Sequence, residues 1–174
     1  MIPRYSRESL PPYRFVPGES PHPTRSPAGH SYGRELAPVV IDDQSWRSCE
    51  PYLFAIDLFN HGYYWEAHEA LEAIWQGVGP DTPIGTFAQG VIQAAAALLK
   101  QTMGERGSAG RLASAAAAKL RAGTAVILGV DAWGLADRLE QYLDGQLTEP
   151  PRLELRECGG RSDPNGPPVR GPFT

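Results

Sequence analysis

The sequence predicts an all-α fold: a single compact bundle of about five helices with a proline-rich N-terminal arm. Two observations support this prediction. Apolar residues recur at helical spacing through the middle of the chain, between residues typical of helix starts and stops. The first 41 residues differ, because they hold eight of the seventeen prolines and show almost no apolar periodicity.

Five helices are expected from these signals. The first is capped by Ser48, with Pro51 in its first turn, and stops near Gly62. The other four are expected at Tyr63–Gln76, Pro83–Thr102, Ala109–Ala122 and Ala132–Asp144. Asp81-Thr82-Pro83 is a strong start signal for the third helix, and Asp131 caps the last one. The short apolar run 124–130 is expected to be a buried connector, with an isolated strand as the alternative.

These elements divide the chain into three parts. Residues 1–41 form the arm, residues 42–149 form the helical domain, and residues 150–174 form a flexible tail that begins at two prolines. The arm contains aromatic residues that can anchor it to the domain: Tyr5, Tyr13, Phe15 and Tyr32.

The arm also carries side chains with functional chemistry, namely His22, Arg25 and His30. Two interpretations remain open. The arm is either a solvated segment or a strap that wraps the helices and brings these side chains to a site.

Composition excludes several classes of function. The 174-residue chain has a net charge of −4, so it lacks the basic footprint of a nucleic-acid-binding protein. No apolar run approaches the length of a membrane span, and no signal core precedes the arm. The two cysteines are far apart and form no CxxC pair. We therefore expect a cytoplasmic protein without nucleic-acid or membrane partners; a homo-oligomer and a small-molecule ligand both remain open.

The segment FNHGYYWEAHEALEAIWQG, residues 59–77, is the candidate functional element. On a helix, His68 and Glu72 stand one turn apart on one face, close to aromatic and apolar side chains that face inward. Charged groups on such a stripe are costly unless they are paired or bound to metal. The candidate catalytic residues are Glu66, His68, Glu69 and Glu72. Supporting residues are Asn60, Tyr64 and Trp75.

The third helix adds two glutamines, Gln89 and Gln93, which are four residues apart and share a face. A short Gly/Pro loop joins this helix to the preceding one, so antiparallel packing is expected. One interpretation is a single polar cluster built from both helices. The other is that the glutamines satisfy backbone groups of a loop.

Three kinds of chemistry fit this cluster. His68 and Glu72 have the spacing of two ligands of a divalent metal, although a glutamate replaces the second histidine of H-E-x-x-H. Without a metal, His68 would serve as a base and Glu69 as a general acid or base, and hydrolysis is the favoured reaction class because it needs only an activated water and an acid. The non-enzymatic alternative is a small-molecule-binding or interaction module in which the cluster fixes helix packing.

The two helical segments resemble the DUF309 family, whose motif reads approximately F-N-x-G-x-Y-x-E-x-H-E-x-L-E-x-x-W and then F-x-Q-G-x-I-Q. The positions that match are Phe59, Asn60, Gly62, Tyr64, Glu66, His68, Glu69, Leu71, Glu72 and Trp75, then Phe87, Gln89, Gly90, Ile92 and Gln93. The resemblance implies a compact all-helical fold. It implies no activity, and the proline-rich arm extends beyond the minimal domain of the family.

Overall fold

The computed structural model describes residues 2–156 and confirms the all-α class. Its five helices are α1 (Glu50–Asn60), α2 (Tyr64–Val78), α3 (Pro83–Thr102), α4 (Arg106–Arg121) and α5 (Ala132–Leu143). A single 3-10 turn, η1 (Trp46–Ser48), precedes α1, and two short strands, β1 (Val126–Ile127) and β2 (Val130–Asp131), precede α5.

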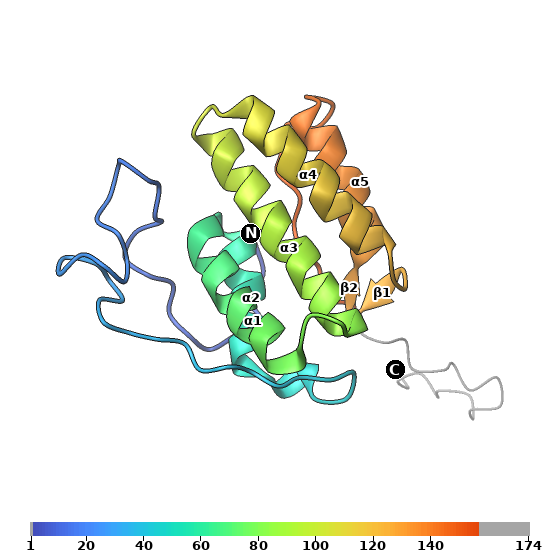
Figure 1. The fold of residues 1–174 in the computed structure, drawn as a ribbon, viewed down its shortest axis with the longest axis horizontal. Coiled ribbons are helices and arrows are strands. Elements are labelled where there is room, and N and C mark those ends of the chain that lie inside the picture. The colour runs from blue at the N-terminus through green and yellow to red at the C-terminus, as the bar shows by residue number, and fades with distance from the viewer. Residues whose placement is uncertain (1, 157–174) are drawn as a thin grey trace, which may run out of the picture.

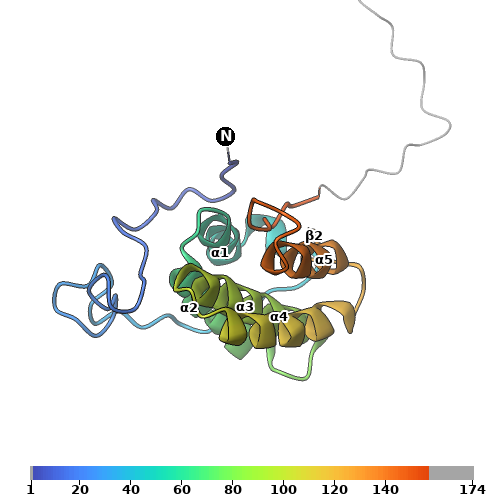
Figure 2. The same ribbon diagram turned by 90° about the horizontal axis from the view of Figure 1, so that it is seen from above.

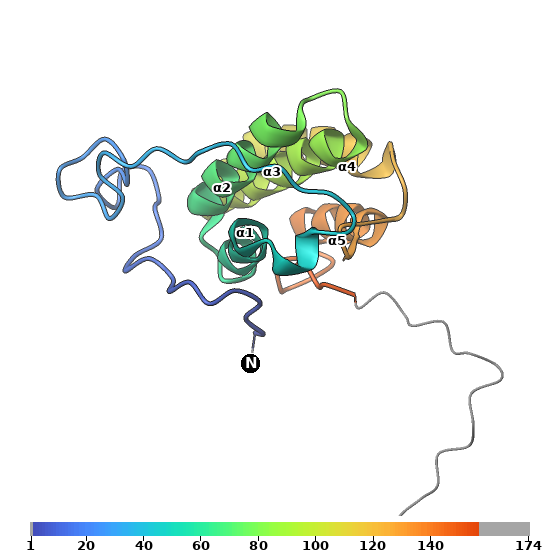
Figure 3. The ribbon, with the colours of Figure 1, turned by 90° about the horizontal axis from the view of Figure 1, so that it is seen from below.

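The helices form two layers. Helices α2, α3 and α4 lie side by side in a row, and α1 and α5 pack on one face of that row (Figures 2 and 3). Each helix packs mainly against the helices that precede and follow it in the sequence, and α3 lies between α2 and α4 (Figure 1). This central place fits the nearly all-apolar surface of α3.

The capping signals in the sequence act as expected at two helices. The Thr82 hydroxyl accepts a hydrogen bond from the Gly85 amide, with Pro83 at the first position of α3. The Asp131 carboxylate accepts one from the Gly134 amide at the start of α5. These bonds satisfy donors that every helix N-terminus leaves free, and they fix where both helices begin.

The expected cap of the first helix was wrong. Cys49 occupies the N-cap position of α1 and makes no side-chain capping bond. Ser48 belongs to η1 instead, and its hydroxyl donates to the Ser45 carbonyl. The Ser48 hydroxyl, expected to cap α1, therefore bonds within the 3-10 turn.

The run 124–130 is a hairpin rather than a connector or an isolated strand. Val126 pairs with Asp131, and Ile127 pairs with Val130, in an antiparallel register. The turn between them places Leu128 at φ 47° and Gly129 at φ 78°, the left-handed pair that tight hairpins require. The apolar composition of the run hid this turn, because leucine is rarely found in that conformation.

The helical domain extends beyond residue 149, which corrects the expected start of a flexible tail at residue 150. Leu153 is fully buried, and its amide and carbonyl bond the Asn60 side chain at 2.7 and 2.8 Å. Leu155 forms an isolated β-bridge with Val130. Residues 150–156 therefore belong to the helical domain, because the Leu153 side chain is part of its hydrophobic core. The rest of the expected tail, 157–174, lies outside the described residues.

The arm begins with a polar clamp on α1. The Asp57 carboxylate is fully buried and accepts hydrogen bonds from the Tyr5 amide, the Ser6 amide and hydroxyl, and Arg4 Nε. Burial alone raises the pKa of Asp57, but the bonds from Ser6, Arg4 and Tyr5 outweigh it and lower that pKa below its ordinary value. The clamp holds the start of the arm against the domain.

The arm ends in extended contact with α2. The Val39 amide donates to the Ala73 carbonyl, and the Val39 backbone lies so close to Gly77 that a Cβ at this position would collide with the Val39 carbonyl oxygen. Gly77 therefore allows this backbone approach within α2, which continues two residues beyond the expected end at Gln76. The helix ends at Val78, and Gly79, whose φ is 87°, is its C-cap residue.

None of the helices within residues 2–156 combines the length and apolar character needed to span a bilayer.

Candidate functional site

Three of the four candidate catalytic side chains come together on the outer side of α2. His68 Nδ1 lies 3.5 Å from Glu69 Oε1, and His68 Nε2 lies 3.4 Å from Glu72 Oε1. Their side chains are half-buried, with exposed fractions of 30, 36 and 41% for His68, Glu69 and Glu72. The helical spacing i, i+1 and i+4 is the reason for this grouping, because one helical turn brings Glu72 back to the face that carries His68. We call these three residues the α2 triad.

The triad favours a protonated imidazole. The neighbouring Glu69 carboxylate is the largest cause that raises the pKa of His68; partial burial of the ring opposes it, and the charge of Glu72 adds to it. At 3.5 Å the contact between Nδ1 and Glu69 is an ion-pair distance, and Nδ1 is a buried atom without a hydrogen-bond partner among residues 2–156. The imidazole thus retains an unused ligand or donor position.

Glu66 is separate from the triad. Its Oε1 accepts a hydrogen bond from the Phe15 amide at 2.9 Å and lies 3.1 Å from His30 Nε2. Glu66 stands two positions before His68, about 200° around the helix, so its carboxylate leaves α2 on a different side. Its role in this structure is to hold the arm, and its Oε2 is buried without a hydrogen-bond partner in the part of the chain that the structure describes.

The arm histidines contact α2 at its first turn. His22 lies against Trp65 with ring centroids 5.1 Å apart, and Phe15 completes this aromatic cluster. His30 reaches Glu66, whereas the Arg25 side chain makes no hydrogen bond or ion pair within residues 2–156. Of the aromatic residues expected as anchors, Phe15 is buried and Tyr32 is exposed.

The expected supporting residues of α1 and α2 have structural surroundings. Asn60 bonds Leu153 through both ends of its amide, in the manner of a strand pair. Tyr64 packs edge-on against Phe59, and burial raises its pKa to about 12. Trp75 Nε1 is a buried donor without a hydrogen-bond partner in the described part of the chain.

The two glutamines of α3 are not joined to the triad. His68 is ten residues before the end of α2 at Val78, and Gln93 is ten residues after the start of α3 at Pro83, so the two lie at a similar height in the bundle. In the described part of the chain, however, no hydrogen bond links Gln89 or Gln93 to a side chain of α2. Gln93 Oε1 is buried and has no hydrogen-bond partner within residues 2–156.

The α2 triad is a candidate metal site. Its three side chains each offer a ligand atom, and these atoms lie within 4.8 Å of one another; no other group of this kind occurs in residues 2–156. Bound ligand atoms at about 2.0–2.2 Å from a metal stand about 3–4 Å apart, so small rotamer changes would close the group. One imidazole and two carboxylates suit divalent transition metals.

Sequence reasoning missed the residues that fix the arm, above all Asp57. The signal was present, because Asp57 lies among the apolar positions Leu53, Ile56 and Phe59 of an expected helix, where a carboxylate needs partners. Its partners are 51 to 53 residues away in a segment without periodicity, so no pattern could identify them.

Comparisons with known proteins agree with the helical motif. Residues 52–112 match the model of a family described as "Domain of unknown function (DUF309)". This match covers most of α1, all of α2 and α3 and the first part of α4, and it confirms the resemblance drawn from the sequence. Neither the curated proteins nor the solved structures include a significant match to this chain.

Proposed function

We propose that His68 and Glu72 of the α2 triad bind a divalent transition metal and that the protein is a hydrolase in which Glu69 acts as the base. The function is inferred from the site itself, because the family matched by residues 52–112 has a description that assigns no activity. His68 and Glu72 hold the ion, and Glu69 accepts the proton of the attacking water. The observation that supports this proposal is the convergence of three ligand atoms from His68, Glu69 and Glu72 within 4.8 Å.

The placement of the triad favours a ligand over a purely structural role. All three side chains come from α2, and their ion pairs are made with one another. Within the described residues, no hydrogen bond or ion pair connects the triad to a second helix, so it cross-links nothing. Half-exposed ion pairs on one helix add little to stability. By contrast, Asn60 and Glu66 join distant segments and have the features of structural residues.

The chemistry follows from the donor set. A divalent metal lowers the pKa of a bound water and so supplies a hydroxide nucleophile near neutral pH. His68 and Glu72, spaced i, i+4, leave the remaining coordination positions to water and substrate. A carboxylate oxygen of Glu69 lies within 4.8 Å of the ligand atoms of His68 and Glu72. The Glu69 side chain is half-exposed, so it can pass a proton to solvent.

Metal content tests the proposal. Untagged protein is loaded with Zn²⁺ or Mn²⁺, desalted and measured by elemental analysis, together with His68→Ala, Glu72→Gln and Glu69→Gln. We expect near-stoichiometric metal in the wild type, loss in His68→Ala and Glu72→Gln, and retention in Glu69→Gln. Glu140→Gln is the matched control, because its side chain is 42% exposed on α5, against 41% for Glu72. Equal metal content in all five proteins, or none in the wild type, would refute the metal site.

Activity is tested on the same set. Loaded protein is screened against ester, phosphoester and amide model substrates. We expect one class to be hydrolysed by the wild type and by Glu140→Gln. Glu69→Gln should bind metal and yet lose most of its turnover, which separates the proton-accepting role from metal binding.

A further inference from the structure

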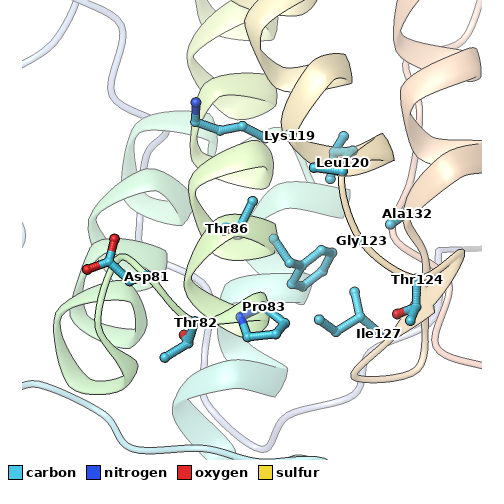
Figure 4. Close-up of a pocket in the computed structure, with 12 residues that line it drawn as sticks. Asp81, Thr82, Pro83, Thr86, Lys119, Leu120, Gly123, Thr124, Ile127 and Ala132 are labelled. Carbon is cyan, nitrogen blue, oxygen red and sulfur yellow. The ribbon is translucent and has the colours of Figure 1, made fainter.

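The structure contains a cavity of about 280 Å³ between the loop before α3, the last turn of α4 and the hairpin that precedes α5 (Figure 4). Pro83, Leu120 and Ile127 are among its lining residues, and none of the lining residues belongs to α2. A substrate bound at the α2 triad therefore does not occupy this cavity. The side chains that contact such a substrate have to come from the surroundings of the triad, on α2 itself and on the segments packed beside it.

Trp65 is an aromatic neighbour of the triad on α2. It precedes His68 by three positions and Glu69 by four, and side chains at these two spacings are adjacent on a helix surface, with Cβ atoms about 5–6 Å apart. Helical side chains also lean toward the N-terminus of their helix, so His68 and Glu69 extend over the turn that carries Trp65. The Trp65 side chain therefore borders both the proposed metal ligand and the proposed base.

The N-terminal arm fixes the position of this indole. Its ring centroid lies 5.3 Å from that of Phe15 and 5.1 Å from that of His22, and the ring planes are nearly perpendicular in both pairs. Phe15 and His22 also contact each other, with centroids 5.0 Å apart. Phe15 is buried, and its amide donates to Glu66, the residue that follows Trp65 in α2. Two rings of the arm thus restrict the rotamer of a tryptophan beside the triad.

We propose that Trp65 is a specificity-determining residue of the triad, and that the substrate carries an aromatic group next to the bond that is hydrolysed. This inference rests on the hydrolase function proposed above. The triad consists of an imidazole and two carboxylates, so apolar contact with a substrate has to come from a flanking side chain. An indole offers a large apolar area and loses little entropy on binding when other rings already hold it. Phe15 and His22 are then positioning residues, which act on the substrate through Trp65.

Two metal-chelating hydroxamates test this inference without the need for turnover. Acetohydroxamate and phenylacetohydroxamate share the chelating group and differ by a phenyl ring. The full-length protein is loaded with Zn²⁺, its metal content is measured, and each hydroxamate is titrated by calorimetry. We expect phenylacetohydroxamate to bind about tenfold more tightly than acetohydroxamate, because its ring is buried against the Trp65 indole.

Variants assign this preference to Trp65. Trp65→Ala should bring the two affinities to within about twofold of each other, whereas Trp65→Phe keeps an aromatic ring and should retain most of the preference. His22→Ala should reduce the preference in part, because the indole loses one of the two rings that hold it. Trp133→Ala is the matched control, since Trp133 is a 48% exposed tryptophan on α5, and it should keep the wild-type preference. The Tm of each variant without ligand shows that it is folded.

The outcomes separate this inference from the proposed function. A wild type that binds no metal would refute the proposed function, and this inference with it. Near-stoichiometric metal together with equal binding of the two hydroxamates would overturn only the role of Trp65. The same holds for a preference that Trp65→Ala leaves unchanged.

Discussion

His30 Nε2 lies 3.1 Å from Glu66 Oε1, and both side chains are 5% exposed. The same carboxylate oxygen accepts a hydrogen bond from the Phe15 amide. Glu66 of α2 therefore contacts the arm at two residues, Phe15 and His30. His30 is oriented in turn by a 2.8 Å contact between its Nδ1 and the Ser31 hydroxyl. The loop 15–30 is thereby closed against the helix.

Replacement of Glu66 should release this loop. In Glu66→Ala the buried Phe15 amide and His30 ring lose their acceptor, and we expect the free energy of unfolding to fall by about 2–3 kcal/mol. Hydrogen exchange should rise at residues 13–33, which report on the loop itself. Glu69→Ala is the control on the same helix, and unchanged exchange in Glu66→Ala would contradict the clamp.

The triad should behave differently when no metal is added. His68→Gln removes both ion pairs of the triad, yet the unfolding free energy of the metal-free protein should change by less than about 1 kcal/mol, because these pairs are half-exposed and lie on one helix. Urea unfolding in the presence of a chelator measures this. A loss as large as that of Glu66→Ala would instead assign the triad a structural role.

Asp57 makes the arm sensitive to acid. Because its pKa is lowered in the folded protein, its contribution to stability is complete above the unfolded-state pKa of about 4 and is lost as pH falls through the folded-state value. The wild type should therefore lose stability below about pH 4 more steeply than Asp57→Asn, which should be the less stable of the two at pH 7. Urea unfolding from about pH 7 to about pH 2.5 gives both curves, and parallel curves would disprove the assignment.

Asn60 should be needed for the C-terminal part of the core. Its amide group donates to the Leu153 carbonyl and its oxygen accepts from the Leu153 amide, so Asn60→Asp keeps the acceptor but sets a buried carboxylate against a carbonyl oxygen. We expect a loss of about 2–3 kcal/mol in unfolding free energy at pH 7 and faster hydrogen exchange at residues 152–156. Stability equal to wild type would show that this pairing is dispensable.

Much of the helical architecture could be predicted because its causes are local. Thr82 and Asp131 mark their helices through bonds to residues three positions away, and the apolar periodicity of α2 and α3 is visible within a few turns. The hairpin could not be predicted, since its turn depends on Leu128 in a conformation that leucine seldom adopts. Leu153 was missed because its partner is 93 residues away.

The candidate site was predicted in part for the same reason. His68, Glu69 and Glu72 come together through helical spacing alone. The division between them and Glu66 follows from the helical angle, but the partner that occupies Glu66, His30, lies in the aperiodic arm.

Helix α1 holds both ends of the described chain. Asp57 binds residues 4–6, Asn60 binds residue 153 one turn further on, and the Leu155 amide contacts the Tyr5 hydroxyl across 150 positions of sequence. These contacts close long loops, which gives the bundle a higher contact order than its helices alone would have. During synthesis the Asn60 side chain has no partner until Leu153, which follows α5 in the chain, has left the ribosome. The fold is therefore complete only once residues 150–156 have been synthesised, because Leu153 bonds Asn60 and Leu155 pairs with Val130.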